Sequence, residues 1–188
     1  MAVDITLIRA YTNGLVACSD FGVSNLVLPT NGTTPLSGDF NEVGALSEDG
    51  VTEATSQDRT DVFIWQGNAL ARRIPGQFVK TWTFAAAETS LVTLGVQFAG
   101  STITQTAEGV TIAEKPPATD IRNWVLHGID GTRAQRIVVP LGEVTERGDV
   151  VWSAGGITVY EWTLSGYLDD ADNVAYRYYV DESLASGS

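Results

Sequence analysis

Hydrophobic and polar residues alternate along most of this chain with the two-residue period of a β-strand. The segments with this pattern, together with shorter apolar runs, are 5–8, 15–18, 78–85, 110–113, 122–127, 133–139, 157–164 and 174–180. One segment, 88–99, instead has apolar residues at helical spacing, with Thr89 or Ser90 as N-cap and Gly100 after its end. The chain therefore predicts a mainly β fold of eight or nine strands and one α-helix, arranged as a β-sandwich or half-barrel.

Glycine and proline positions predict where the strands end. Asn13-Gly14 lies between two apolar runs and predicts a hairpin turn. Pro75-Gly76 and the segment 128–131 predict further turns, and Pro140 is expected to stop the strand before it.

The segment 51–60 is polar on both sides of its predicted strand. Alternate residues point to opposite faces of a strand. Glu53 and Asp58 therefore lie on different faces of this strand, and at most one of them can face inward, toward a water-filled space that the strand borders. Only 62–65 gives the segment an apolar end. A strand that is wet on both faces is weakly specified alone. We therefore expect it to border a water-filled space and a neighbouring subunit.

The rest of the chain reads as a single domain, 1–188. A loop at about 20–42 is rich in Gly, Pro, Asn, Ser and Thr, and loops of this length in compact domains are usually functional. The end of the chain, 183–188, is expected to be a flexible tail.

The net charge is −12, from 23 acidic and 11 basic residues. This balance argues against a protein that grips nucleic-acid phosphates, but not against a surface that DNA slides past. The one cysteine, Cys18, excludes an internal disulfide and is expected to be a small buried residue. The chain opens without a signal-peptide pattern and has no membrane-spanning apolar run, so we expect synthesis in a cytoplasm.

Catalytic and metal-binding patterns are missing from the sequence. The one histidine, His127, has no partners at triad spacing and is interpreted as structural. Glu48-Asp49 and Asp169-Asp170 are neighbours that point different ways, as in solvated turns. Asp170-Ala171-Asp172 lacks the glycine and glutamate that a calcium loop needs farther along. We therefore expect no catalytic residues, no cofactor and no metal.

Two stretches carry a family resemblance. LSEDGVTEATSQDRTDVFIWQG, which begins at Leu46, resembles the signature of major tail tube proteins of long-tailed (siphovirus-type) phages, especially those infecting actinobacteria. In the second half, VTERGDVVWS from Val144 and YEWTLSGYLD from Tyr160 are similar to the last third of the same proteins. The resemblance covers about 43–100 and 133–182, and it does not separate a phage tube from a gene-transfer-particle tube.

The resemblance implies a structural subunit of a virion tail. Such subunits form hexameric rings with a continuous inner β-barrel, and the rings stack into a hollow tube through which viral DNA passes without sequence-specific binding. A tape measure protein and a tail terminator are the implied further partners. The implied lumen or inter-subunit residues are Glu48, Asp49, Glu53, Asp58, Arg59 and Asp61, and the implied inter-ring loop residues are Leu28, Pro29, Asn31, Pro35 and Leu36.

One alternative from another class stays open at this point. Five tryptophans and six tyrosines could form the sugar-binding platform of a β-sandwich carbohydrate-binding module. Rings or filaments would favour the tube, whereas a monomer with a sugar-dependent shift would favour the binding module.

Overall fold

The computed structural model describes residues 4–23 and 26–184. Within them the fold is mainly β with one α-helix, as predicted. The strands are β1 Asn13–Ser19, β2 Phe40–Glu42, β3 Leu46–Phe63, β4 Leu70–Ala86, β5 Thr102–Thr106, β6 Gly109–Ala113, β7 Ile121–Asp130, β8 Arg133–Arg147, β9 Tyr160–Gly166 and β10 Tyr176–Val180. The helix is α1 Leu91–Gln97, and short 3₁₀ turns are η1 Ile5–Leu7, η2 Gln66–Asn68 and η3 Glu182–Leu184.

Eight of these strands form one antiparallel sheet in the order β2-β1-β7-β8-β9-β4-β3. The first part of β8 pairs with β10, through Ala134–Val138, and its later part pairs with β9 from Gly142 onward. The two ends of the sheet, β2 and β3, do not pair with each other. The sheet is therefore an open half-barrel and not a closed barrel.

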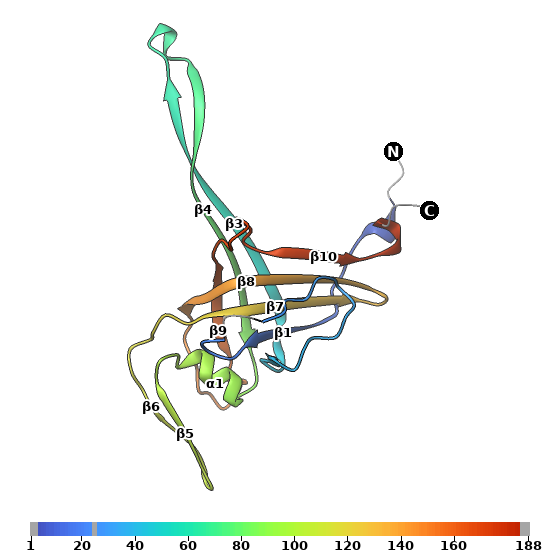
Figure 1. The fold of residues 1–188 in the computed structure, drawn as a ribbon, viewed down its shortest axis with the longest axis vertical. Coiled ribbons are helices and arrows are strands. Elements are labelled where there is room, and N and C mark those ends of the chain that lie inside the picture. The colour runs from blue at the N-terminus through green and yellow to red at the C-terminus, as the bar shows by residue number, and fades with distance from the viewer. Residues whose placement is uncertain (1–3, 24–25, 185–188) are drawn as a thin grey trace.

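A long two-stranded arm projects from this half-barrel (Figure 1). β3 and β4 pair with each other from Leu46 and Ala86 out to Phe63 and Leu70, whereas β9 covers only the inner part of β4, Thr81–Ala86. The outer part is a ribbon of two strands, which turns at η2, where Gly67 and Asn68 have positive φ angles of 73° and 49°. The arm continues the body's own sheet, so its base is anchored and its tip is not.

An aromatic core holds the body together. Trp82, Phe84, Trp124 and Trp162 come from β4, β7 and β9 and are at most 2% exposed. Phe84 lies edge-on to Trp162 at 5.8 Å between ring centroids, and Trp124 lies 6.5 Å from Trp162. Edge-to-face contacts of this kind add to the stabilisation from burial. The core therefore ties the arm-bearing strands to the rest of the sheet.

The loop between β1 and β2 covers the opposite face of β7 and β8. Its described leucines, Leu26, Leu28 and Leu36, pack on a second cluster that includes Val125 and Val138. β7 is consequently buried on both faces, and the sequence interpretation of 122–127 as a one-sided strand is wrong. The alternation of Trp124 and Leu126 with Asn123 and Val125 predicts one core face and one solvent face, but this loop covers the second face.

Helix α1 lies at the end of the body opposite the arm (Figure 1). Ser90 caps it, since its Oγ accepts a hydrogen bond from Thr93 N at 3.1 Å, which confirms the predicted helix and cap. Near its other end, Arg147 donates to Val96 O at 2.9 Å and Arg122 to Gly95 O at 3.3 Å. These cations satisfy carbonyls that the helix itself leaves unpaired.

Three sequence-based turn or strand predictions are wrong, at 5–8, at Asn13-Gly14 and at 128–131. The segment 5–8 is not a strand, and Ile5–Leu7 within it forms a 3₁₀ turn. Asn13-Gly14 starts β1 and pairs with β7 instead of forming a hairpin turn. A Cβ on Gly14 would lie 2.5 Å from His127 O, so this glycine permits close strand approach. Gly128 is likewise inside β7, and the turn is Gly131-Thr132.

Both prolines expected to interrupt strands lie inside them. Pro75 is within β4, where Gln57 pairs with Phe78 but Arg59 pairs with Pro75, so β4 has one extra residue. Pro140 is within β8, where the same kind of register shift occurs opposite 122–124. Such bulges accept a residue without an N–H. Strand β8 therefore continues past Pro140 and ends at Arg147, so most of the segment 142–149 is strand.

Several strand boundaries also differ from the pattern. The strand predicted at 157–164 begins only at Tyr160, and the strand predicted at 174–180 begins at Tyr176. β5 and β6 form a separate two-stranded hairpin outside the main sheet. The predicted tail overlaps η3 at 183–184, and the remainder, 185–188, lies outside the described residues.

Substituting one buried and one exposed tryptophan tests which side chains form the core. We expect Trp162→Ala to lower the free energy of unfolding by about 3–5 kcal/mol, because this fully buried ring is in contact with Phe84 and Trp124. Trp152→Ala is the matched control, since its side chain is 88% exposed, and should change stability by about 0.5 kcal/mol or less. Urea unfolding of both variants measures the difference; equal losses would contradict the assigned core.

Candidate functional site

The free edge of β3 is the largest unpaired edge of the described sheet. β3 is 18 residues long and pairs only with β4. The backbone N–H and C=O groups on its other side therefore have no partner strand within the described chain. An exposed edge of this length is a ready template for pairing with another chain.

The sheet of β3, β4, β9 and the end of β8 has one face that is polar throughout. Cross-strand pairing places Thr52, Thr83 and Thr163 in one row, and Ala54, Thr81 and Ser165 in the next. Hydroxyls on this face meet across strands, since Thr145 Oγ1 lies 2.8 Å from Ser165 Oγ. We define the hydroxyl face as Thr52, Ala54, Ser56, Thr81, Thr83, Ala85, Glu143, Thr145, Glu146, Glu161, Thr163 and Ser165.

The hydroxyl face carries acids but no bases. Glu143 pairs with Ser165, Glu146 with Thr163, and Glu161 with Ala85, so all three carboxylates share this face. None of the positions that define the face is Lys or Arg. The sequence analysis did not single out these glutamates. The alternation of threonine and serine with Trp82, Trp162 and Leu164 indicates that each strand has one polar face. It does not show which strands lie side by side, so it does not predict that these polar faces join.

Glu53 lies on the opposite face of β3, the face that carries the core residues. There it links the base of the arm to β10 by an ion pair. Its carboxylate accepts hydrogen bonds from Arg177 Nη2 on β10 at 2.5 and 2.6 Å, and it forms an ion pair with Lys80 on β4. Partial burial raises the pKa of Glu53, but the hydrogen bonds from Arg177 and Lys80 outweigh it, so the pKa lies below its ordinary value. Glu53 is thus ionised and already paired.

The other predicted arm residues lie farther out. Asp58, Arg59 and Asp61 are exposed on the ribbon beyond the body. Asp61 accepts a hydrogen bond from Arg73 Nε at 2.9 Å, and these two residues are direct cross-strand partners. The arm therefore brings Asp58, Arg59 and Asp61 together, but not with Glu48 and Asp49 at the start of β3.

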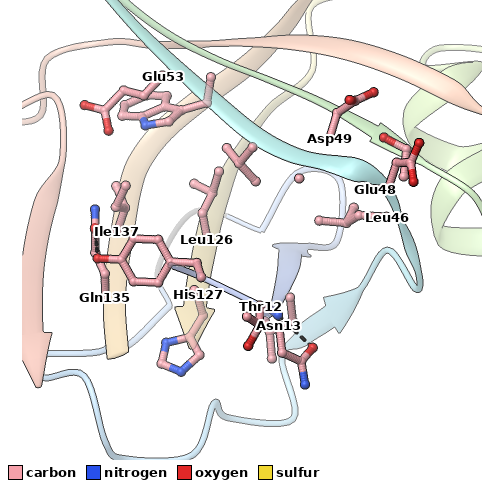
Figure 2. A pocket seen from close by; sticks show the side chains of 18 of the residues that line it. Thr12, Asn13, Leu46, Glu48, Asp49, Glu53, Leu126, His127, Gln135 and Ile137 are labelled. Carbon is pink, nitrogen blue, oxygen red and sulfur yellow. Dashed lines mark hydrogen bonds between the residues drawn. The ribbon is translucent and has the colours of Figure 1, made fainter. Parts of the chain in front are cut away.

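A pocket of about 770 Å³ opens between the start of β3 and the strands β1, β7 and β8 (Figure 2). β3 contributes Glu48, Asp49 and Glu53, and the facing strands contribute Leu126, His127, Gln135 and Ile137. Tyr11 also lines it and donates a hydrogen bond to Gln135 Oε1 at 2.7 Å. The pocket lies at the open side of the half-barrel, and its lining mixes apolar Leu126 and Ile137, acidic residues of β3, and the polar or basic side chains of Gln135, His127 and Arg177.

His127 in this pocket is a neutral structural residue. Burial and the nearby guanidinium of Arg136 hold the pKa of His127 below its ordinary value. Arg136 Nε donates to His127 Nδ1 at 3.3 Å. In the described residues no nucleophile–base–carboxylate arrangement includes this histidine, and no cluster of three or more His, Cys, Asp or Glu side chains could hold a metal ion.

Packing and hydrogen bonds hold the loop with the predicted inter-ring residues against the body. Leu28 and Leu36 pack on the second cluster. Asn31 Oδ1 accepts hydrogen bonds from the N–H groups of Thr33 and Thr34, at 3.0 and 2.7 Å. Arg136 donates to the carbonyls of Asn31 and Thr34, at 3.1 and 2.7 Å. Pro29 and Pro35 lie in the same loop between β1 and β2, which does not include the arm.

The pairing of Glu53 with Arg177 and Lys80 makes the stability of the fold depend on pH. Its lowered pKa means that its contribution is present above the unfolded-state pKa of about 4.3 and is lost as the pH falls through the folded-state value. We expect Glu53→Gln to cost about 1 kcal/mol or less at pH 7, because the ion pairs are partly exposed. Urea midpoints of wild type and variant should converge as the pH falls below the ordinary range of a carboxyl; a difference that does not change with pH would contradict this assignment.

Comparison with known proteins adds independent findings. The profile of the family described as phage tail tube protein matches residues 14–186. A search of curated proteins gives no match. Among solved structures, the chain is similar to one from "Virion of native gene transfer agent (GTA) particle", with 11% identity, a TM-score of 0.47, and coverage of 93% of this chain and 100% of that chain.

The profile match spans almost the whole chain and confirms the resemblance carried by 43–100 and 133–182. Within the described residues, no helix is long and apolar enough to cross a membrane. The chain therefore belongs to the phage tail tube protein family: it is a structural subunit of a multi-subunit tube in a virion, and not an enzyme.

Proposed function

We propose that this subunit forms hexameric rings that stack into the tail tube of a long-tailed phage, with the hydroxyl face lining the lumen. The single observation that carries the proposal is the free edge of β3, an 18-residue strand that pairs with β4 on one side and with no described strand on the other. Pairing this edge with a neighbouring copy around a ring satisfies the unpaired backbone groups and removes the edge by closure.

The choice of lumen face follows from packing. The other face of the same strands carries Trp82, Phe84, Trp162 and Leu164, which are buried in the core of the subunit. Only the hydroxyl face is left to border a water-filled channel. The sequence predicts that at most one of Glu53 and Asp58 faces inward, and under this proposal it is not Glu53, because Glu53 lies on the core side and is paired with Arg177 and Lys80.

The chemistry of the hydroxyl face suits the passage of DNA. A cationic wall would bind phosphates and release counterions, so DNA would stick with strong salt dependence. Threonine and serine hydroxyls hold water, and Glu143, Glu146 and Glu161 repel phosphates over a screening length of about 8 Å. DNA then passes without sequence-specific binding, and a tape measure protein and a tail terminator would complete the tail. No observation favours the carbohydrate-binding alternative.

Assembly is the direct test of this function. We expect the purified protein, or tails from infected cells, to show six-fold rings and stacked tubes in electron microscopy. Particles from infected cells are included because free tube subunits can require an initiator. Monomers in solution together with tails that lack this protein would contradict the proposal.

Lysines on the hydroxyl face test the lumen assignment. Thr52→Lys and Glu146→Lys both place a cation on that face at exposed positions, so the subunit should fold and assemble normally. Genome ejection should slow at least tenfold at low salt and recover at high salt, because phosphate binding is screened. Thr104→Lys, on the β5–β6 hairpin, is the matched control and should eject normally. Normal ejection by both hydroxyl-face variants at low salt would refute the assignment.

A further inference from the structure

A row of four side chains crosses the sheet beneath the loop that joins β1 to β2. Leu15 of β1 pairs with His127 of β7, and His127 pairs in turn with Arg136 of β8. Arg136 also pairs with Tyr178 of β10. Leu15 and Tyr178 pack on the second hydrophobic cluster, so the row lies on the face that the loop covers. We define the strap as the part of this loop at 26–36, which the structure describes throughout.

Arg136 holds the middle of the strap against the body. Its side chain is almost fully buried, and its Nη1 donates hydrogen bonds to the carbonyls of Asn31 and Thr34 at 3.1 and 2.7 Å. Between these two residues, Gly32 lies against β10, since a Cβ on Gly32 would be 2.5 Å from Val180 Cγ2. The turn 31–34 is therefore docked by the guanidinium of Arg136 and by the close contact of Gly32.

No carboxylate neutralises Arg136 within the described residues. The salt bridges of that part of the chain do not include Arg136, and the strap has no Asp or Glu. A buried arginine is usually paired with an anion. Here two carbonyls and the ring of His127 take that place, because Arg136 Nε donates to His127 Nδ1 at 3.3 Å. This hydrogen bond requires a neutral imidazole with its proton on Nε2.

Protonation of His127 would remove this acceptor and place a second positive charge beside the guanidinium. Like charges in a partly buried site repel strongly, because the surroundings screen them poorly. The other charged or titratable residues around the row and along the pocket that His127 borders are Tyr11, Glu48, Asp49, Glu53, Arg177 and Tyr178. Among the described residues, no salt bridge joins His127 to a carboxylate.

We propose that His127 and Arg136 form a pH-sensitive latch for the strap. While the imidazole is neutral, Arg136 holds the carbonyls of Asn31 and Thr34. Once His127 takes up a proton, the two cations move apart and the turn 31–34 leaves β10. The latch lies within one subunit, so it does not depend on the formation of rings.

The direction of the pH dependence follows from proton linkage. Burial and the guanidinium of Arg136 hold the pKa of His127 below its ordinary value of about 6.5 while the turn is docked. Release hydrates the ring and separates it from Arg136, so the pKa returns toward that value. The released state therefore binds the proton more tightly. The docked state is favoured above about pH 6.5 and is lost as the pH falls through the lowered pKa.

Nuclear magnetic resonance tests the latch directly. His127 is the one histidine of the chain, so its ring signals report a single titration. The nuclear Overhauser effect between Gly32 and the Val180 methyl protons reports whether the turn is docked. We expect this effect to fall roughly fivefold or more as the ring titrates, with one shared midpoint below about pH 6.5. Solution spectra serve for free subunits and solid-state spectra for assembled tubes, so either form can be measured.

Three variants separate the latch from a general effect of acid. His127→Gln is the matched control, because its amide oxygen accepts from Arg136 and never becomes charged, so the turn should stay docked over the whole pH range. His127→Lys carries a permanent cation at neutral pH and should release the turn there. Arg136→Gln should release it at every pH and return the His127 midpoint toward its ordinary value.

The outcomes decide for or against the latch. Loss of the Gly32–Val180 contact together with the titration of His127, and its persistence in His127→Gln, support the proposal. It would be overturned by a contact that survives titration of the ring, by equal loss in His127→Gln, or by a ring that stays neutral down to about pH 4.5, near the ordinary carboxyl range. If Arg136→Gln does not fold, the comparison of wild type with His127→Gln still decides.

Discussion

An unpaired strand edge is the constraint on which this structure depends. β3 runs for 18 residues with a partner on one side only, and most of its side chains are polar on both faces. A strand with no apolar face of its own is held by its neighbours. Here β4 holds it along its full length, and Glu53 fixes its base through Arg177 on β10. No described strand pairs with the remaining edge, and the proposed ring would pair it with another chain.

The aromatic core makes such an edge possible. Trp82, Phe84 and Trp162 bury enough surface on one side of β4 and β9 that the other side of these strands can carry the hydroxyl face. The two helix-capping arginines, Arg122 and Arg147, close the end of the core away from the arm. A subunit built this way folds around one face of these strands and leaves both the hydroxyl face and the edge of β3 exposed.

The mainly β fold class and the strand that is polar on both faces, 51–60, could be predicted from the sequence, because both follow from local patterns. The N-cap at Ser90 and the two-sided polarity of 51–60 need no tertiary information. Pro75 and Pro140 misled because bulges inside paired strands accept a proline, and a bulge is a property of two strands. The hydroxyl face was out of reach for the same reason: its residues meet only through cross-strand register.

Amide hydrogen exchange along β3 tests the central claim most directly. In the free subunit, the amides of 46–63 that point away from β4 should exchange rapidly, while those bonded to β4 should be protected. In assembled tubes, the outward amides should become protected as well, because a neighbouring copy pairs with them. Rapid exchange of the same amides in tubes would contradict the account, since the edge of β3 would then remain open in the assembly.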